Sequence, residues 1–319
     1  MGVFDLSLER LKEYTGINPR PEDFDEFWDR SLSELWRIDP CVEIVPAGIR
    51  CSFADCYSLY FTGPADSRIH SKLIIPKGLR SPTGAVLKFH GYSGNSGAWT
   101  DGFQFTAAGL VYAAMDCRGQ RGYSQDRGTV SGDTFHGIFI RGIDDGPEKM
   151  TMRNTFLDTA MLARTVMAME EVDEKRIGTF GGSQGGALAT VCAALVPGIK
   201  KAAVLYPFLS DYKRVWEMDL AAGAYEELKT YFRTYDPRHQ REDEIFRKLG
   251  YIDIQNLAPR IKAEVLFFTG LMDTVCPPST QFAVYNKILS EKKMNIYPDF
   301  GHEIVAGAYD EAFEFLMDI

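Results

Sequence analysis

Three residue types stand along the chain in an order that fits nucleophilic attack on an acyl carbon. Ser183 lies within Gly181-Gly182-Ser183-Gln184-Gly185, a GxSxG pattern whose glycines leave room around a sharp turn. A serine hydroxyl is a weak nucleophile at neutral pH, so it needs a base, and that base needs an orienting carboxylate. Asp273 and His302 follow the serine in the order acid, then histidine, that enzymes with such a turn use. We therefore predict Ser183, Asp273 and His302 as a catalytic triad.

Other roles for the acid and the histidine stay open at this point. An aspartate shortly before Pro277-Pro278 is often a turn former or a helix cap, and a histidine in a glycine-flanked loop is often a surface side chain. Asp299 and Glu303 are alternative orienting acids, although both are close to His302 in sequence. The remaining histidines are weaker candidates for the base: His70 in an expected edge strand, His90 beside a glycine-rich loop, His136 before the nucleophile, and His239 in a charged segment.

Two backbone N–H groups are needed to stabilise the oxyanion that such an attack creates. We predict Gln184, directly after the nucleophile, as one donor, and Tyr92, in the loop after an earlier buried strand, as the other. The same loop read as a simple turn is the alternative. An acyl pocket is expected near Tyr92, Pro207 and Phe208.

The triplet Arg118-Gly119-Gln120 directly follows an apolar run. Its guanidinium could bind an anionic substrate, but we favour a structural role in which bidentate hydrogen bonds to carboxylates tie loops together. The sequence contains no GxxxxGK[ST] phosphate loop, and no set of histidines and acids has metal-ligand spacing. We predict neither a metal nor a cofactor.

Short apolar runs alternate with possible helices over most of the chain. This pattern is typical of strands whose two faces are both covered by helices. We therefore predict an α/β protein with a mainly parallel central sheet. Its ligands should then lie at the carboxyl ends of the strands, where Ser183, Asp273 and His302 all fall. The expected strands are 85–89, 110–115, 177–180, 202–206, 265–268 and 294–297, and the expected helices are 151–169, 185–195, 279–289 and 306–317.

Three segments depart from this alternation. Residues 1–37 carry apolar side chains at helical spacing and predict a helical cap. Residues 42–75 alternate apolar and polar side chains, which favours antiparallel strands at one edge of the sheet. Residues of about 208–258 are polar and helical and offer no strand, so we expect a lid-like insertion within a single domain of residues 1–319.

Charge and hydropathy exclude several classes of protein. The chain has 35 basic and 44 acidic side chains and a net charge of −9, which argues against nucleic-acid binding. No apolar run reaches the roughly 18 residues of a membrane helix, and the first residues do not resemble a signal peptide. We expect a cytoplasmic protein that binds neither a membrane nor nucleic acid. The six scattered cysteines predict buried free thiols rather than disulfides.

Several of these patterns together resemble carbohydrate esterase family 7, the acetyl xylan esterases and cephalosporin C deacetylases. The resemblance rests on Arg118-Gly119-Gln120, Gly181-Gly182-Ser183-Gln184-Gly185-Gly186 and His302-Glu303, and it extends over His90-Gly91-Tyr92, Pro207-Phe208-Leu209 and the N-terminal helices. It implies an α/β-hydrolase fold and a triad of Ser183, Asp273 and His302.

The resemblance also implies a substrate and an assembly. The substrates would be short acetylated xylo-oligosaccharides and cephalosporin C, and the assembly a homohexamer whose active sites face an internal cavity that excludes polymeric xylan. Two alternatives remain. One is another carboxylesterase or a peptidase of the same fold, and the other is a catalytically silent binding protein that keeps the scaffold.

Overall fold

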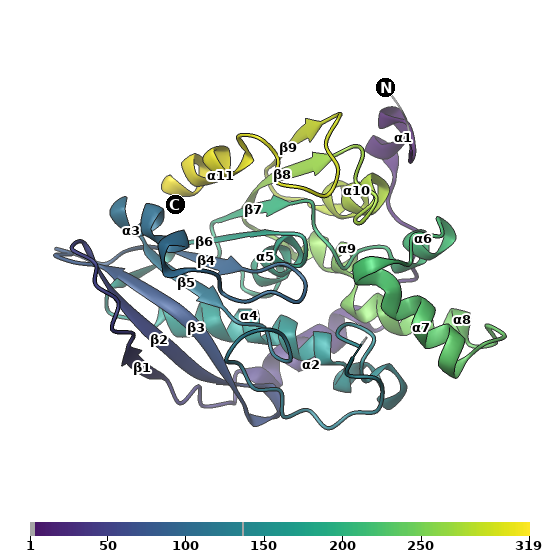
Figure 1. Cartoon of the computed structure of the whole chain (residues 1–319), viewed down its shortest axis with the longest axis horizontal. Coiled ribbons are helices and arrows are strands. Elements are labelled where there is room, and N and C mark those ends of the chain that lie inside the picture. Colours follow the sequence, from purple (N-terminus) through teal and green to yellow (C-terminus); the bar gives the residue numbers. More distant parts are fainter. Residues whose placement is uncertain (1–3, 136) are drawn as a thin grey trace.

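One sheet runs through the part of the chain that the computed structural model describes, residues 4–135 and 137–319 (Figure 1). Its strands are β1 (Glu43–Pro46), β2 (Ala54–Gly63), β3 (Ser67–Pro76), β4 (Thr83–Phe89), β5 (Val111–Met115), β6 (Val172–Gly182), β7 (Lys201–Leu205), β8 (Glu264–Gly270) and β9 (Lys292–Tyr297). Their order is β1-β2-β3-β5-β4-β6-β7-β8-β9. The pairings from β1 through β3 to β5 are antiparallel, and every pairing from β5 to β9 is parallel. The predicted mainly parallel sheet with an antiparallel edge is confirmed.

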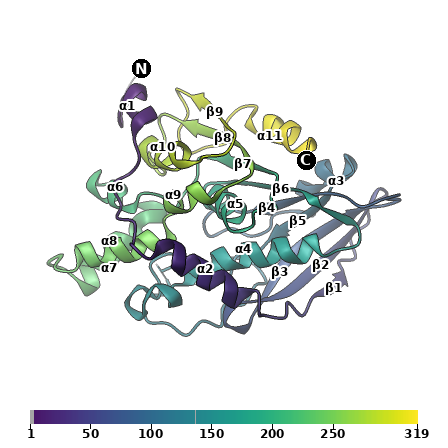
Figure 2. The same cartoon turned by 180° about the vertical axis from the view of Figure 1, so that it is seen from behind.

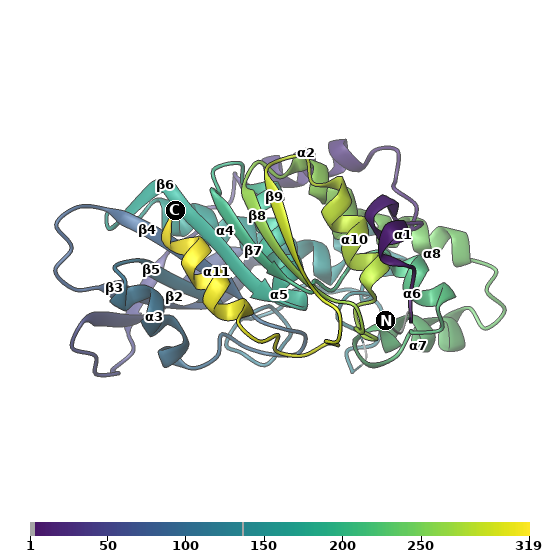
Figure 3. The ribbon, with the colours of Figure 1, turned by 90° about the horizontal axis from the view of Figure 1, so that it is seen from above.

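Helices cover both faces of this sheet (Figures 1 and 3). The described α-helices are α1 (Leu8–Glu13), α2 (Phe24–Leu35), α3 (Phe103–Ala107), α4 (Thr151–Met167), α5 (Gln184–Leu195), α6 (Tyr212–Glu217), α7 (Glu226–Tyr235), α8 (Glu242–Leu249), α9 (Ile254–Leu257), α10 (Pro278–Lys287) and α11 (Ala308–Met317). Helices α3 and α11 lie together on one face, and α2, α4 and α5 lie on the other (Figures 2 and 3).

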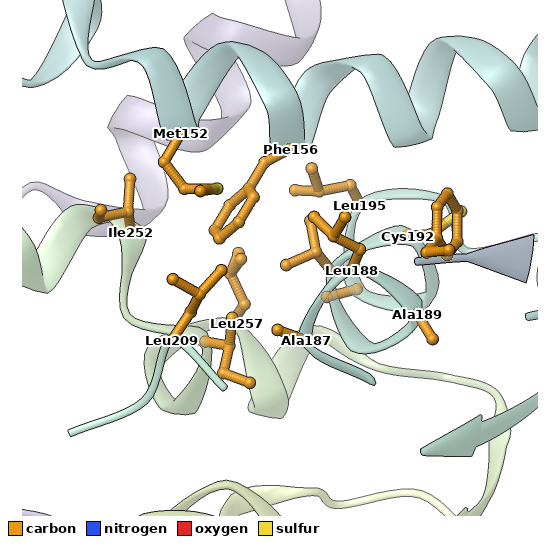
Figure 4. Close-up of a cluster of buried hydrophobic side chains, with 14 of the residues drawn as sticks. Met152, Phe156, Ala187, Leu188, Ala189, Cys192, Leu195, Leu209, Ile252 and Leu257 are labelled. Carbon is orange, nitrogen blue, oxygen red and sulfur yellow. The ribbon is translucent and has the colours of Figure 1, made fainter. Parts of the chain in front are cut away.

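The continuous apolar runs follow from burial on both faces, since successive side chains of a strand point to opposite sides of the sheet. In β4, Val86 joins the core beneath α3 and α11, whereas Leu87 joins the core beneath α4 and α5. In the core that contains Leu87, Phe156 of α4 lies beside Leu188 of α5 (Figure 4). A helix on each side of the strand therefore requires apolar residues at consecutive positions.

The sequence was a weaker guide between the recognisable strands. Helix α3 is not among the four expected helices, and the described part of residues 116–142, which follows the apolar run at 110–115, forms no α-helix. His70 was expected in an edge strand, but β3 pairs with both β2 and β5 and is internal. The reason is that the antiparallel edge contains three strands, and β1 and β2 cover β3 from outside.

The segment between β7 and β8 is helical and contains α6, α7, α8 and α9, with no strand in these described residues. We call residues 208–258 the insertion. Helices α6, α7 and α8 lie beyond the carboxyl ends of the parallel strands (Figure 1). The insertion is therefore close to the edge at which the predicted site residues follow their strands.

The N-terminal segment holds the start of the insertion through hydrogen bonds to a buried acid. Asp211 accepts from the Tyr14 hydroxyl at 2.8 Å and from the backbone N–H groups of Ile17 and Asn18 at 3.0 and 2.8 Å. Asp5 also accepts from Arg214 of α6 at 2.8 Å. Residues before α2 thus bind α6 directly.

The cysteine and membrane predictions can be compared with the structure. All six thiols are free, as expected, and Cys56, Cys117, Cys192 and Cys276 are buried. The burial prediction is wrong for Cys41, which is exposed in the polar stretch before β1, and Cys51 is only partly buried. Within residues 4–135 and 137–319, no helix is both long enough and apolar enough to cross a bilayer.

Candidate active site

Ser183 occupies a strained turn between β6 and α5. Its backbone lies at φ 57° and ψ −124°, a conformation that L residues rarely adopt. Neighbouring glycines make the turn possible, since a Cβ on Gly185 would approach the carbonyl oxygen of Phe89 to 2.1 Å. Hydrogen bonds from the Ser183 N–H to Leu205 and from the Phe208 N–H to Ser183 fix the turn against the end of β7. The hydroxyl is thereby raised above the carboxyl edge of the sheet.

The three predicted triad side chains meet at this turn. The Nε2 atom of His302 lies 3.0 Å from Ser183 Oγ, and its Nδ1 atom lies 2.8 Å from Asp273 Oδ2. Asp273 follows β8 and His302 follows β9, so the ends of two adjacent strands deliver the acid and the base. The first distance is within the reach needed for proton transfer from the serine to the imidazole, and the second allows Asp273 to orient the ring.

The acid is completely buried and its lone pairs are fully engaged. Asp273 Oδ1 accepts from the N–H groups of Val275 and Cys276 at 2.9 and 2.8 Å, while Oδ2 accepts from Gln281 at 3.2 Å and faces His302. These donors fix the position of the carboxylate beside His302. Asp299 and Glu303, the alternative acids, are exposed, and Glu303 accepts from the Gly301 N–H instead.

Both predicted oxyanion donors border the serine. Gln184 is the first residue of α5, where N–H groups have no partner within the helix, and Tyr92 lines the same cavity as Ser183. The Gln120 side chain braces both segments. It forms a reciprocal amide pair with Gln184, at 3.0 and 3.1 Å, and accepts from the Ser93 N–H at 2.8 Å.

The other residues of the 118–120 triplet lie away from this cavity. Arg118 is fully buried and binds Asp158 of α4 through two nitrogens, at 2.7 and 2.8 Å, and it also contacts the Pro64 carbonyl. Gly119 adopts φ +67° in the turn that follows. The geometry matches the structural role favoured for the triplet, with no guanidinium exposed to a ligand.

The remaining histidines are not assembled with the serine. His90 is a brace: its Nε2 accepts from the Cys117 N–H at 3.0 Å, and burial lowers the pKa of its imidazole, which favours the neutral form. His70 pairs with Asp116 in a separate buried position, and His239 contacts Glu242 in the insertion. His136 lies outside the described residues.

A cavity of about 500 Å³ opens above Ser183 and His302. Tyr92 lines it as predicted, but Pro207 and Phe208 do not, so their expected place in the wall is corrected. Phe208 is buried, and its ring packs edge to face against the ring of Tyr92, with 5.7 Å between the ring centroids. The cavity is lined instead by residues that include Tyr206, Ala224 of the insertion, Lys88 and Tyr309.

Cys276 is a neighbour of the site that the sequence did not single out. Its buried thiol lies beside the Ser183 hydroxyl, and burial raises the pKa of the thiol well above its ordinary value. Among the described residues, Asp273, Cys276 and His302 form the one group whose donor atoms lie close enough together to hold a metal ion. Cysteine binds a metal ion as its thiolate, and the raised pKa of Cys276 disfavours that form. The carboxylate and the imidazole are already hydrogen-bonded to each other and to Ser183, so this environment opposes metal binding.

Two further supporting residues also escaped sequence analysis. Gln281 of α10 donates to Asp273, and Glu227 of α7 accepts from the Tyr92 hydroxyl at 2.6 Å. Neither lies in a recognisable pattern. Gln281 lies in the first turn of α10, which begins at Pro278 shortly after Asp273, and this closeness in sequence is what could have indicated its role.

Comparison with known proteins agrees with this geometry. The family model described as acetyl xylan esterase (AXE1) matches residues 1–319. The chain belongs to this family. Two solved acetyl xylan esterases are similar along nearly their whole length. The one from Thermoanaerobacterium sp. JW/SL YS485 is 55% identical with a TM-score of 0.97, and the one from Paenibacillus sp. R4 is 34% identical with a TM-score of 0.93. Each alignment covers 98% of this chain and 99% of the other.

Other proteins resemble this acetyl xylan esterase family member at lower sequence identity. Acetyl esterase Axe7A of Xylanibacter ruminicola is 27% identical over 311 residues, which cover 92% of this chain but 65% of that protein. Oligopeptidase B from Leishmania major, at 16% identity and a TM-score of 0.60, shares the fold alone. The α/β-hydrolase fold implied by the sequence resemblance is confirmed.

Proposed function

We propose that this chain is a serine esterase that removes acetyl groups from small acetylated carbohydrates. The observation that carries the proposal is the continuous hydrogen-bonded path from Ser183 Oγ through His302 to Asp273, at 3.0 and 2.8 Å. Membership of the acetyl xylan esterase family supports the acetyl ester as the substrate class. Short acetylated xylo-oligosaccharides and cephalosporin C are the specific substrates that we propose.

The reaction proceeds as acyl transfer in two halves. His302 Nε2 takes the proton of Ser183 as Oγ attacks the acetyl carbonyl carbon, and Asp273 holds Nδ1–H so that Nε2 remains the acceptor. The carbonyl oxygen becomes an oxyanion that accepts from the N–H groups of Tyr92 and Gln184. The carbon–oxygen bond to the sugar then breaks, and the sugar alcohol leaves with the proton from His302.

Water completes the second half. It enters the cavity, loses a proton to His302 and attacks the acetyl-enzyme, and the tetrahedral intermediate collapses to acetate and the free serine. The proton returns to Ser183 Oγ, so acid, base and nucleophile are all restored. The scheme uses no metal or cofactor.

A Ser183→Ala variant tests the nucleophile. Turnover of p-nitrophenyl acetate and of acetylated xylobiose should fall to background while the circular dichroism spectrum is unchanged. Appreciable remaining turnover would exclude Ser183 as the nucleophile. A fluorophosphonate probe should label the wild-type protein at Ser183, whereas a catalytically silent scaffold would not react.

Substrate class is tested separately. Acetyl esters should be hydrolysed faster than butyryl and octanoyl esters, and faster than an aminoacyl amide. A preference for the amide would favour the peptidase alternative, and a preference for long acyl chains would favour a general carboxylesterase. Cephalosporin C is assayed by acetate release.

We also propose a homohexamer located in the cytoplasm. Light scattering coupled to size-exclusion chromatography should then give a mass about six times the 35.8 kDa of one chain. Acetylated polymeric xylan should be a poor substrate beside its oligosaccharides. A monomer that deacetylates the polymer equally well would contradict both points.

A further inference from the structure

Glu227 is a buried acid of the insertion, and it binds residues from two other parts of the chain. Its side chain, in the first turn of α7, is only 2% exposed. Oε2 accepts from three successive backbone N–H groups, those of Ile138, Phe139 and Ile140, at 2.8, 2.9 and 3.1 Å. Oε1 accepts from the Tyr92 hydroxyl at 2.6 Å. Four donors therefore converge on one carboxylate.

This arrangement is costly to the folded protein. Burial raises the pKa of Glu227 to about 7, even though the Tyr92 hydroxyl and the three N–H groups lower it. A buried charge is usually less stabilising than apolar packing of the same size. An acid at this position is therefore better explained by what it holds in place than by a gain in stability.

Tyr92 is held at both ends of its side chain. Its ring packs edge to face against Phe208 at 5.7 Å, and its hydroxyl is fixed by Glu227. Burial, followed by the charge of Glu227, raises the pKa of the phenol, so the hydroxyl stays protonated and donates. Because the side chain has only two rotatable bonds, fixing the ring and the hydroxyl restricts the backbone that carries them.

The backbone N–H of Tyr92 is the oxyanion donor in the proposed reaction. Its loop is fixed at the next residue by the bond from the Ser93 N–H to Gln120. On the other side, His90 is held by the Cys117 N–H. The bond to Glu227 is a hydrogen bond by which the insertion holds this loop, in addition to the packing of Phe208 on the Tyr92 ring.

We propose that Glu227 is a positioning residue that holds Tyr92 by its hydroxyl, so that the Tyr92 N–H stays directed at the oxyanion. The inference rests on the proposed function. It assigns the insertion a part in catalysis besides lining the cavity through Ala224: α7 fixes one of the two donors that stabilise the transition state. The Phe139 and Ile140 amides, in turn, fix the carboxylate.

Tyr92→Phe is the sharpest test, since it removes only the hydroxyl and leaves the ring and the backbone N–H. We expect kcat for p-nitrophenyl acetate to fall about 10-fold to 100-fold with KM changed less than about 2-fold, because loss of a whole donor costs about 10²–10³. The kcat of Glu227→Ala should fall by a similar factor. The double variant should be no slower than the slower single variant, because both changes break one contact.

Glu227→Gln is the rescue variant. Its amide oxygen can accept from the three N–H groups while its NH₂ donates to the Tyr92 oxygen, so it should recover most of the kcat that Glu227→Ala loses. Glu226→Gln, on the exposed neighbouring residue, is the matched control and should behave as wild type. Circular dichroism and thermal melting exclude misfolding as the cause of any loss.

The results separate this inference from the proposed function. If Tyr92→Phe and Glu227→Ala keep wild-type kcat while Ser183→Ala is inactive, the positioning role is overturned and the serine mechanism stands. The positioning role would also be overturned if the fold-losses in kcat of the two single variants multiplied in the double variant. If Ser183→Ala keeps its activity, the proposed function itself fails.

Discussion

Replacing Asp273 by asparagine should change the tautomer of His302 without changing the shape of the site. Asp273 Oδ1 accepts from the N–H groups of Val275 and Cys276, so the asparagine carbonyl oxygen is expected to take that place. The new NH₂ then stands where Oδ2 faced His302 Nδ1. Nδ1 must accept from it, and the ring proton moves to Nε2. Ser183 Oγ then faces a donor instead of a base.

The expected loss in kcat is about 10⁴-fold, which is about 5.4 kcal/mol in the barrier. The buried acid does not line the cavity, so KM should change little. The new NH₂ would also meet the Gln281 amide nitrogen, which lies 3.2 Å from Oδ2. A modest loss of stability is therefore expected beside the loss of rate.

The assay is the initial rate of p-nitrophenyl acetate hydrolysis near pH 7.5, with circular dichroism and melting as checks of folding. Asp299→Asn is the matched control, since Asp299 is exposed and lies three positions before His302. It should retain wild-type kcat. More than a tenth of the wild-type kcat in Asp273→Asn would refute the assignment, and a large loss in the control would transfer the role to Asp299.

Three further substitutions test the supporting structure. Gly185→Ala places a Cβ 2.1 Å from the Phe89 carbonyl oxygen and should destabilise by about 3 kcal/mol or more, measured by urea denaturation; an unchanged midpoint would contradict the close approach. Arg118→Leu leaves Asp158 buried and unpaired and should cost about 3–5 kcal/mol, with part regained when Asp158 is also replaced by leucine; full stability of the single variant would show that the pair is not needed. The pKa of Glu227 is about 7 in the folded chain and ordinarily 4.5, so the folded state binds this proton more tightly than the unfolded state does. The free energy of unfolding should therefore fall by up to about 3 kcal/mol as the pH rises from about 4.5 to 7. Glu227→Gln should remove that fall in melting curves taken from pH 5 to 8, and an identical pH profile for both proteins would refute it.

The buried strands and the serine turn could be predicted because their causes are local. A strand covered on both faces needs consecutive apolar residues, and a turn as sharp as that at Ser183 needs glycine at fixed offsets. Asp273 and His302 were identifiable for a related reason, since each follows its own strand at the same edge of the sheet.

The errors arise where several distant segments decide the outcome. Phe208 was expected near the acyl pocket, but its buried ring packs against Tyr92, Phe139 and Tyr225 and does not line the cavity. The contact between Glu227 and Tyr92 joins residues 135 positions apart, and no spacing within either segment indicates it. Short-range patterns therefore pointed to the three side chains that the structure brings together and missed Glu227, which holds Tyr92.

The hydrogen bonds to Asp211 bear on how the protein can be trimmed or tagged for experiments. Removal of residues up to Asn18 would withdraw three hydrogen-bond donors from the fully buried Asp211 side chain. Shortened versions should become sensitive to proteases first around α6 rather than at the new end. An affinity tag placed at the carboxyl terminus leaves these contacts intact.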